Sequence, residues 1–385
     1  MSNLLSDTTW GSRAATGPPV ILWELPDWPY FRWDASALAQ PLAEAHLKQG
    51  RFLGRMERLG FALRTEAELL AVTEEALKNA EIEGEILNRA SVRSSVARRL
   101  GIPDGGLGPE DRRAEGLVEM TLDATKNSSA PMTRDRLAAW HAALFPTGRS
   151  GLQAITIGGW RTDAQGPMQV VSGAVGRQRV HYQAPPAARV DAEMGAFLDW
   201  FNAPPPLDGI VTAALAHLWF VTIHPFDDGN GRIARTLADM ALARSEQSPT
   251  RFYSLSSQIR RERPDYYASL ERTQKGDLDV TARLLWFIAC FGRAIDAAEE
   301  ACAGVLRRAD FWQRHAAVPF TERQRTVLAR VLGEFEGTLT ARKWAALAKC
   351  SMATAQRDIK DLVDRGVLRR NEGGSKNTSY IVAPA

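Results

Sequence analysis

The stretch that decides the fold of this chain runs from residue 224 to residue 235 and reads His224-Pro225-Phe226-Asp227-Asp228-Gly229-Asn230-Gly231-Arg232-Ile233-Ala234-Arg235. Apolar runs flank it on both sides. Before it stand Ala214, Leu215, Leu218, Trp219, Phe220 and Val221, and after it stand Leu237, Met240 and Ala241. This pattern predicts a buried helix, a tight polar loop and a second buried helix.

The composition of the loop is that of an anion site. Gly229 and Gly231 allow the backbone to bend, so that successive N–H groups converge on one point, where the next helix also places its positive dipole end. Arg232 and Arg235 lie one turn apart on that helix and can reach the same side. We therefore expect a site that binds more than one phosphate.

Two further residues add chemistry to this anion site. Asp228 can hold Mg²⁺, which binds nucleotides through a carboxylate and phosphate oxygens. His224 can accept a proton near neutral pH. The loop thus combines a phosphate site, a candidate metal ligand and a candidate general base.

Here the sequence resembles the Fic family, whose motif is His-x-Phe-x-Asp/Glu-Gly-Asn-Gly-Arg-x-x-Arg. Every defined position is matched, which makes the signal far more specific than a lone G-x-G-x-x-G. The resemblance extends over roughly residues 23–298. It implies an all-α Fic fold with a small β-hairpin flap, on which a substrate peptide lies as an added strand.

The resemblance also implies a reaction. His224 would deprotonate a Tyr, Thr or Ser hydroxyl of a target protein, which attacks the α-phosphate of ATP and releases pyrophosphate. Asp228 would hold the Mg²⁺ cofactor, and Phe226 would fix the loop from the core. The nucleotide contacts implied are Gly229, Asn230, Gly231, Arg232 and Arg235. Tyr266 and Tyr267 could border the base pocket; core packing is the alternative for both.

A segment far upstream resembles the family's inhibitory motif, Ser/Thr-x-x-x-Glu-Gly/Asn. It is the helix segment from Asn79 to Gly84, in which Glu83 would pair with Arg235 and block the seat of the ATP γ-phosphate. Asn79 departs from the expected Ser or Thr but keeps hydrogen-bonding capacity. A solvated acid is the alternative for Glu83, and Glu81 and Glu85 are competing acids. In some members the same Glu supports AMP removal, which stays open as a second activity.

The rest of the chain reads as helices and one hairpin. Short β-prone pieces at 168–171 and 179–182 enclose glycine-containing turns and predict the hairpin. Among the eleven Trp residues, Trp10, Trp23, Trp28 and Trp33 favour a buried aromatic plug. We expect an N-terminal helical region with the inhibitory helix over 1–110, a catalytic core over 111–300, and a linker helix with a C-terminal winged helix-turn-helix over 301–385.

The last 65 residues carry the positive charge. Residues 321–385 hold twelve Lys and Arg against seven Asp and Glu, a net of +5, whereas the remaining 36 basic and 38 acidic residues give −2. Three helices and a glycine-rich hairpin predict the winged helix, with Ser351, Thr354, Arg357 and Lys360 facing DNA. Asp358 and Asp361 on the same helix would repel phosphates, and protein docking is the alternative use. The competing hypothesis for the whole chain is a transcription regulator that only senses a nucleotide. The intact His224 argues against it, because sensing a nucleotide requires no general base.

Composition limits the remaining choices. The three cysteines, Cys290, Cys302 and Cys350, lack a C-x-x-C spacing, which argues against a disulfide framework or a zinc site. No apolar run approaches the ~20 residues that a membrane span requires, and no signal peptide is expected in residues 1–17. We therefore expect a cytoplasmic protein that binds ATP and a target protein, with DNA as a candidate partner of the C-terminal winged helix, and no membrane.

Overall fold

The computed structural model describes residues 21–102, 108–164, 166–172, 177, 179–203, 207–333, 335, 338–371 and 378–383. The expected features outside the described residues are Trp10, the turn containing Gly173 and Gly176, and the glycine-rich loop at 372–377. The chain forms two compact units. The first is the segment that ends at Glu57 together with Thr65–Glu300, and the second is Arg58–Arg64 together with Ala301–Ala385.

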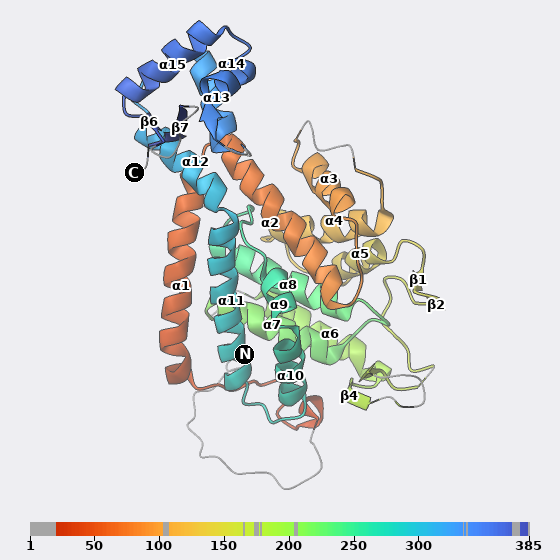
Figure 1. Ribbon diagram of the computed structural model, residues 1–385. Coiled ribbons are helices and arrows are strands. Elements are labelled where there is room, and N and C mark those ends of the chain that lie inside the picture. The colour runs from red at the N-terminus through yellow and green to blue at the C-terminus, as the bar shows by residue number, and fades with distance from the viewer. Residues whose placement is uncertain are drawn as a thin grey trace. The chain divides into compact units, whose positions relative to one another are not determined.

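The first unit consists mainly of helices, with two short antiparallel hairpins (Figure 1). Its elements are the 3₁₀ turn η1 (Leu22–Glu24), α1 (Ala35–Glu57), α2 (Phe61–Ile82), α3 (Arg89–Arg99), α4 (Arg112–Lys126), α5 (Arg134–Leu144), β1 (Arg149–Ser150), β2 (Gln153–Ala154), β3 (Gln169–Ser172), β4 (Arg179–Gln183), α6 (Ala187–Asn202), α7 (Gly209–Ile223), α8 (Asn230–Glu246), α9 (Leu255–Arg261), α10 (Arg263–Gln274) and α11 (Thr281–Ala301).

Helices α7 and α8 form the centre of this unit, and α4 packs against α8. Both central helices are buried over most of their length. α7 is apolar around its whole circumference, as expected of a helix covered on all sides. The prediction of two buried helices on either side of the polar loop is therefore confirmed.

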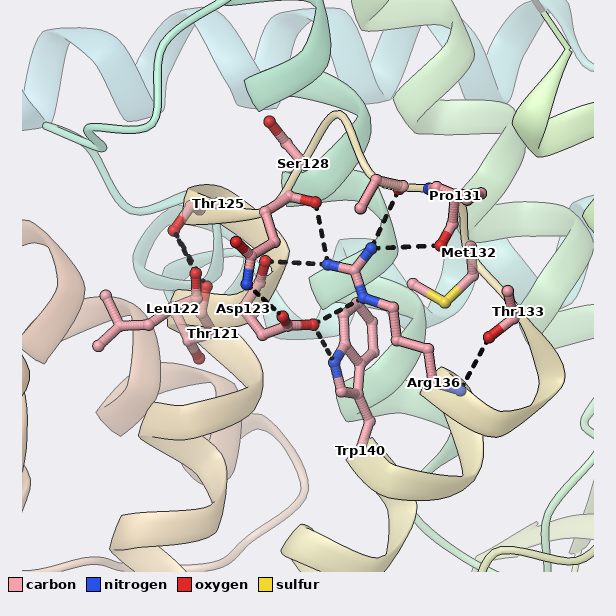
Figure 2. A network of polar contacts seen from close by, with 12 residues as sticks. Thr121, Leu122, Asp123, Thr125, Ser128, Pro131, Met132, Thr133, Arg136 and Trp140 are labelled. Atoms are coloured by element: carbon pink, nitrogen blue, oxygen red, sulfur yellow. Dashed lines mark hydrogen bonds and ion pairs between the residues drawn. The ribbon is translucent and has the colours of Figure 1, made fainter.

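Helices α4 and α5 pack at unusually short range. A Cβ atom added to Gly116 of α4 would lie 1.8 Å from the carbonyl oxygen of Ala143 in α5, so only glycine fits there. Figure 2 shows how the turn between the two helices is fixed. The Arg136 side chain donates to the Asp123 carboxylate and to the backbone carbonyls of Asp123, Asn127, Ala130 and Pro131. Arg136 thereby holds α5 in place.

The expected hairpin is confirmed: β3 pairs antiparallel with β4, with a bulge between Val170 and Val171. The aromatic plug is confirmed for Trp23 and Trp28, which are 7% and 8% exposed, and Trp28 packs edge-on against Trp219 of α7. Trp28 therefore covers one side of the central helix, Trp23 lies instead under Arg189 of α6, and Trp33 is only half-buried.

Two helices of the N-terminal part have clear starts. Helix α2 begins at Phe61. The start of α1 is capped by Asp34, whose carboxylate accepts from the N–H groups of Ser36 and Ala37. Aspartate is one of the residues preferred at this position.

The second unit has its own small core. Its elements are α12 (Ala303–Arg314), α13 (Glu322–Leu332), β5 (Leu339–Thr340), α14 (Ala341–Ala348), α15 (Met352–Asp364), β6 (Leu368–Arg370) and β7 (Ser379–Val382). The strands form an antiparallel sheet in the order β5-β7-β6, of which β5 was not expected. The fully buried Trp344 is the largest side chain of this core. The side chains of Thr321, Thr340 and Ser351 cap the three helices α13, α14 and α15.

Among the described residues, no helix combines the length and the apolar character needed to cross a membrane.

Candidate active site

The polar loop begins at His224, which directly follows α7 and adopts a left-handed backbone with a φ of 53°. A non-glycine residue in this region is held there by its surroundings, and such residues cluster at functional sites. Its ring Nδ1 lies 3.2 Å from the Val221 carbonyl oxygen, so Nδ1 carries the hydrogen and Nε2 keeps a free lone pair. Burial, together with the nearby Arg161 cation, lowers the pKa of His224 to about 4. At neutral pH the ring is therefore an unprotonated base.

The middle of the loop is braced by Asn230. Its side-chain oxygen accepts from the Phe226 N–H at 2.9 Å, and its amide nitrogen donates to the Phe226 carbonyl at 2.8 Å. Asn230 is 1% exposed, so its side chain holds the loop, and only its backbone is left to face a phosphate. Phe226 is fully buried, as the resemblance implied.

Gly229 is the N-cap of α8 and has a φ of 82°, the left-handed conformation that favours glycine. A Cβ atom at Gly229 would also lie 2.9 Å from the Phe145 ring. The backbone therefore turns sharply into the helix, and the N–H groups of its first turn have no acceptor within the helix. An anion is well placed at such a terminus.

Asp228 lies at the mouth of this turn with 43% of its side chain exposed. One carboxylate oxygen accepts from the Gly229 N–H at 2.5 Å, and the other accepts from the Ser150 hydroxyl. Among the described residues, no group of three or more His, Cys, Asp or Glu side chains could hold a metal ion. A single exposed carboxylate suits Mg²⁺, which takes most of its ligands from substrate phosphates and water.

Three residues that the sequence did not single out support the loop. His141 of α5 stacks on Phe226 with ring centroids 4.2 Å apart, and its Nε2 lies 3.2 Å from the Asp228 carbonyl oxygen. Ser150 of β1 contacts Asp228 as described. Arg161 donates from Nε to the His224 carbonyl at 2.7 Å. All three come from segments with no motif of their own, so only their position in the fold reveals them.

The end of α2 covers Arg235. Its guanidinium, 1% exposed, donates from Nε to the Asn79 side-chain oxygen at 2.7 Å, from Nη2 to the Asn79 carbonyl at 3.0 Å and from Nη1 to Glu83 at 2.8 Å. Burial lowers the pKa of Arg235, but the Glu83 carboxylate outweighs it and raises the pKa above its ordinary value. Asn79 also donates to the Arg232 carbonyl at 3.3 Å. Asn79 and Glu83 therefore occupy every nitrogen of this arginine.

The fit between α2 and α8 depends on Gly231. A Cβ atom at this position would lie 2.2 Å from the Glu83 carboxylate and 3.2 Å from Nη1 of Arg235. The Tyr267 hydroxyl lies 3.4 Å from the other oxygen of Glu83. Glu83 thus lies against the start of α8, in the place where an anion would bind.

Arg232, the other arginine of the motif, pairs with a different carboxylate, that of Glu85. Arg232, 6% exposed, donates from Nη1 to Glu85 at 2.8 Å, and its guanidinium lies 4.8 Å from the Phe145 ring centroid. The second oxygen of Glu85 lies 3.4 Å from Nη1 of Arg113 in α4. Glu81, by contrast, pairs with Lys78 and Arg260. Glu85, one of the two acids that competed with Glu83 in the sequence analysis, therefore pairs with Arg232.

Tyr266 is not where the nucleotide-binding expectation placed it. It is 1% exposed, and its hydroxyl lies 2.9 Å from Nε2 of the buried His217. The structure therefore assigns Tyr266 to the core, which was the alternative expectation, because its side chain points into the bundle while that of the next residue, Tyr267, reaches Glu83.

The flap is anchored to α10 through a charged cluster. Glu271 accepts from Arg179 at 3.0 Å and from Lys275 at 2.7 Å, and it lies 2.7 Å from Nδ1 of His181. Burial raises the pKa of Glu271, but the hydrogen bonds to Lys275, His181 and Arg179 together outweigh it and lower the pKa to about 2. The Ser172 hydroxyl completes the cluster at 2.6 Å from Nε2 of His181.

Comparison with known proteins places this site in a family. Residues 131–242 match the Fic/DOC family, and residues 21–102 match a domain of unknown function, DUF4172. A protein adenylyltransferase Fic of Nematostella vectensis is 40% identical over 119 residues, which is 29% of this chain and 25% of the relative. A protein adenylyltransferase fic-1 of Caenorhabditis elegans is 43% identical over 83 residues, 21% of this chain and 15% of the relative. The chain thus spans a quarter or less of the length of these curated relatives.

Two solved structures share the fold. A Fic family protein from Desulfovibrio desulfuricans superposes with a TM-score of 0.58 at 20% identity, covering 96% of this chain and 99% of the other. A Fic domain-containing signalling protein from Bacteroides thetaiotaomicron gives 0.51 at 18% identity, covering 68% and 97%. With the loop at 224–235 lying inside the matched residues and the helical architecture shared with these structures, residues 131–242 of this chain are a Fic domain.

Proposed function

We propose that this chain is a protein adenylyltransferase that moves AMP from ATP to a Tyr, Thr or Ser hydroxyl of a target protein and is restrained by Glu83. The observation that carries the proposal is the pairing, on one loop, of an unprotonated base at His224 with an anion site at the start of α8. The names of the adenylyltransferase relatives support the same reaction.

In this reaction His224 is the general base. Nε2 takes the proton of the target hydroxyl, whose oxygen forms a bond to the α-phosphorus as the bond to the β-phosphate oxygen breaks and pyrophosphate leaves. Because Nδ1 is held by the Val221 carbonyl, the ring presents Nε2 without a change of tautomer. A pKa of about 4 keeps the base available throughout the neutral range.

The phosphates would lie at the start of α8. The backbone N–H groups of Asn230 and Gly231 and the guanidinium of Arg232 would face the developing negative charge, and the Gly229 N–H would join them after it leaves the Asp228 carboxylate. Arg235 would face the terminal phosphate. Asp228 would hold Mg²⁺, whose chemistry is to neutralise phosphate charge.

Glu83 would act as the restraint because it already makes the contact that a phosphate needs. Its carboxylate lies 2.8 Å from Nη1 of Arg235 and against Gly231, so ATP and Glu83 compete for one cation. The flap would receive the target segment along β3, since that strand pairs only with β4 among the described strands.

The test uses ATP labelled at the α- or γ-phosphate with Mg²⁺, on the wild type and the variants Glu83→Gly and His224→Ala. His46→Ala serves as a matched histidine control, because His46 pairs with Asp208 away from the loop. We expect covalent label from the α position only, stronger in Glu83→Gly, lost in His224→Ala and kept in His46→Ala. No label in any variant despite confirmed ATP binding would refute AMP transfer by this chain and favour AMP removal or nucleotide sensing.

A second function is favoured by one observation on the C-terminal unit, which we infer to be a winged helix that binds DNA. Asp358 and Asp361, the two acids expected to repel phosphates, each form an ion pair with an arginine of the same unit. Asp358 is 6% exposed and accepts two hydrogen bonds from Arg323, and Asp361 pairs with Arg365 at 2.8 Å. The exposed charged residues of α15 are Arg357, Lys360 and Asp364, and the two basic ones are those expected to contact the groove.

This second function is tested by titrating the full chain against duplex DNA at several salt concentrations. Arg357→Ala should weaken binding and flatten the salt dependence, whereas Arg330→Ala, an exposed arginine on α13, should do neither. Equal effects of the two variants, or no salt-dependent binding, would leave protein docking as the use of this unit.

A further inference from the structure

Arg161 is a buried arginine whose hydrogen bonds join the loop to the base of the flap. It is 2% exposed and lies between the β1–β2 hairpin and β3. Its Nε donates to the His224 carbonyl at 2.7 Å, and its Nη2 donates to the Pro185 carbonyl at 2.5 Å. Its own N–H donates to the Pro225 carbonyl at 2.8 Å. Pro185 stands just after β4, so one side chain contacts both the base of the reaction and the strand pair beside it.

The hydrogen bond from Arg161 to the His224 carbonyl helps to hold His224 in its left-handed backbone conformation. A left-handed backbone at a non-glycine residue is unfavourable by about 1 kcal/mol or more and persists only where the surroundings fix it. The carbonyl of that residue ends α7, where the partial negative charge of the helix favours a cation. A guanidinium supplies several donors in one plane, which a lysine ammonium does not. Arg161 is therefore suited both to hold the turn and to bridge it to Pro185.

We propose that Arg161 is the positioning residue of the transfer reaction, which fixes His224 in its left-handed turn and at a set distance from the flap. This inference rests on the proposed function. If the flap presents the target hydroxyl, then the relative placement of Pro185 and His224 sets the approach of that hydroxyl to Nε2. The Tyr182 hydroxyl, which donates to the Thr222 carbonyl at 2.7 Å, is a second link between β4 and the end of α7.

The chain offers a matched control at Arg244. That side chain also donates to three backbone carbonyls, those of Ser128, Phe201 and Ala130, and lies over the Phe201 ring, but it contacts no residue of the loop. Replacing either arginine with lysine should lower stability. Only the replacement of Arg161 should alter the reaction.

The experiment compares Arg161→Lys and Arg244→Lys in the Glu83→Gly background, with thermal unfolding to confirm that both fold. Because a displacement of about 1 Å in a reacting group lowers a rate by roughly 100-fold, we expect kcat of Arg161→Lys to fall by that order while the KM for ATP changes less than about twofold. Arg244→Lys should keep both constants. Equal kinetic losses in the two variants, or a loss confined to KM, would overturn the positioning role.

A readout without turnover separates this inference from the proposed function. The Arg161 cation opposes protonation of His224, whereas Glu83 and Asp228 favour it. In an NMR titration of the otherwise unchanged chain, Arg161→Gln should therefore raise the pKa of His224, and Arg244→Gln should leave it in place. A His224 titration that is identical in the two variants would contradict the inference even if the chain transfers no AMP.

A second inference rests on a different contact, that of Glu85 with Arg232. The two acids Glu83 and Glu85 each take one of the two motif arginines, and Arg113 lies 3.4 Å from the second oxygen of Glu85. The Arg113 side chain is 58% exposed, whereas Arg232 is buried. Glu85 therefore lies between two cations: the buried Arg232, which would bind a phosphate in the proposed reaction, and the exposed Arg113, which would not.

From this arrangement we infer that Glu85 is a second restraint on the nucleotide site, which releases Arg232 to a phosphate by turning to Arg113. The probe is ATP binding measured by calorimetry without a target protein, so the result does not depend on transfer. Glu81→Gln is the control, because Glu81 belongs to the same turn but pairs with Lys78.

Losing one charge-assisted hydrogen bond that competes with the ligand should tighten ATP binding by about tenfold in Glu85→Gln. Arg113→Ala should act in the opposite direction and weaken ATP binding, since Glu85 then has Arg232 alone. ATP affinities of Glu85→Gln and Glu81→Gln that agree within about twofold would overturn this restraint, as would tighter binding in Arg113→Ala.

Discussion

Replacing Asn79 with alanine tests how firmly α2 is held on α8. Arg235 is 1% exposed, and its Nε donates to the Asn79 side-chain oxygen at 2.7 Å. Alanine keeps the backbone carbonyl that Nη2 uses but leaves Nε of a buried cation without an acceptor. Hydrogen bonds to charged groups contribute about 1.5–3 kcal/mol, and ~2 kcal/mol corresponds to roughly a 30-fold change in an equilibrium constant.

The assay is hydrogen exchange of the amides in the last turns of α2, because the two compact units need not unfold together. We expect exchange there to accelerate by roughly 30-fold in Asn79→Ala, in line with ~2 kcal/mol lost from local opening. The control is Lys78→Ala, the preceding residue, whose side chain pairs with Glu81 and is 28% exposed. Unchanged protection in Asn79→Ala, or equal acceleration in Lys78→Ala, would refute the reasoning.

Three further predictions concern the same unit. Tyr266→Phe should lose about 1–2 kcal/mol of stability in urea denaturation, because the buried hydrogen bond to His217 is gone, and should keep its ATP affinity; a large affinity loss would return Tyr266 to the nucleotide site. Gly231→Ala should accelerate exchange at the end of α2 by about tenfold or more, since the new Cβ displaces Glu83, and unchanged exchange would contradict the close fit. Because the pKa of Glu271 is lowered from 4.5 to about 2, its contribution to flap stability is fully present above 4.5 and declines as the pH falls toward 2. Flap exchange should therefore keep its protection at about pH 5 and lose it near pH 2, whereas Glu271→Gln should lose it already at about pH 7.

The sequence was informative where one short motif carries both fold and chemistry. His224, Asp228 and the glycines were identifiable because their spacing within twelve residues is specific, and the apolar runs beside them indicated the two central helices. The pairing of Glu83 with Arg235 was foreseen from a resemblance and is present at 2.8 Å. The motif is a local pattern that needs no knowledge of the tertiary structure, whereas the pairing of Glu83 with Arg235 joins residues 152 positions apart and was available only through the resemblance.

What sequence reasoning missed depends on contacts between distant segments. Arg161 stands 63 positions before the residue whose carbonyl it contacts, and Glu85 stands 147 positions before Arg232. Neither residue type is unusual at its place, since an isolated Arg or Glu is most often a solvated surface residue. Tyr266 and Tyr267 illustrate the same limit, because adjacent helical positions face different directions and only the packing decides which one is buried.

The proposed restraint by Glu83 is continuous with buried contacts of α2. Glu75, Asn79 and Glu83 follow one another at four-residue intervals, so Glu75 and Asn79 lie on one face of α2 and Glu83 continues that face just after its last residue, Ile82. Glu75, 1% exposed, accepts from the Ser254 hydroxyl and the Ser256 N–H, while Asn79 and Glu83 hold Arg235. Releasing Arg235 by moving all of α2 would therefore break the buried contacts of Glu75 as well. If Glu83 is the restraint, a change confined to the segment after α2, in which Glu83 leaves Arg235 while Glu75 and Asn79 stay in place, would free the proposed phosphate site at a lower free-energy cost, and this is the step that ATP or a target protein would need to drive.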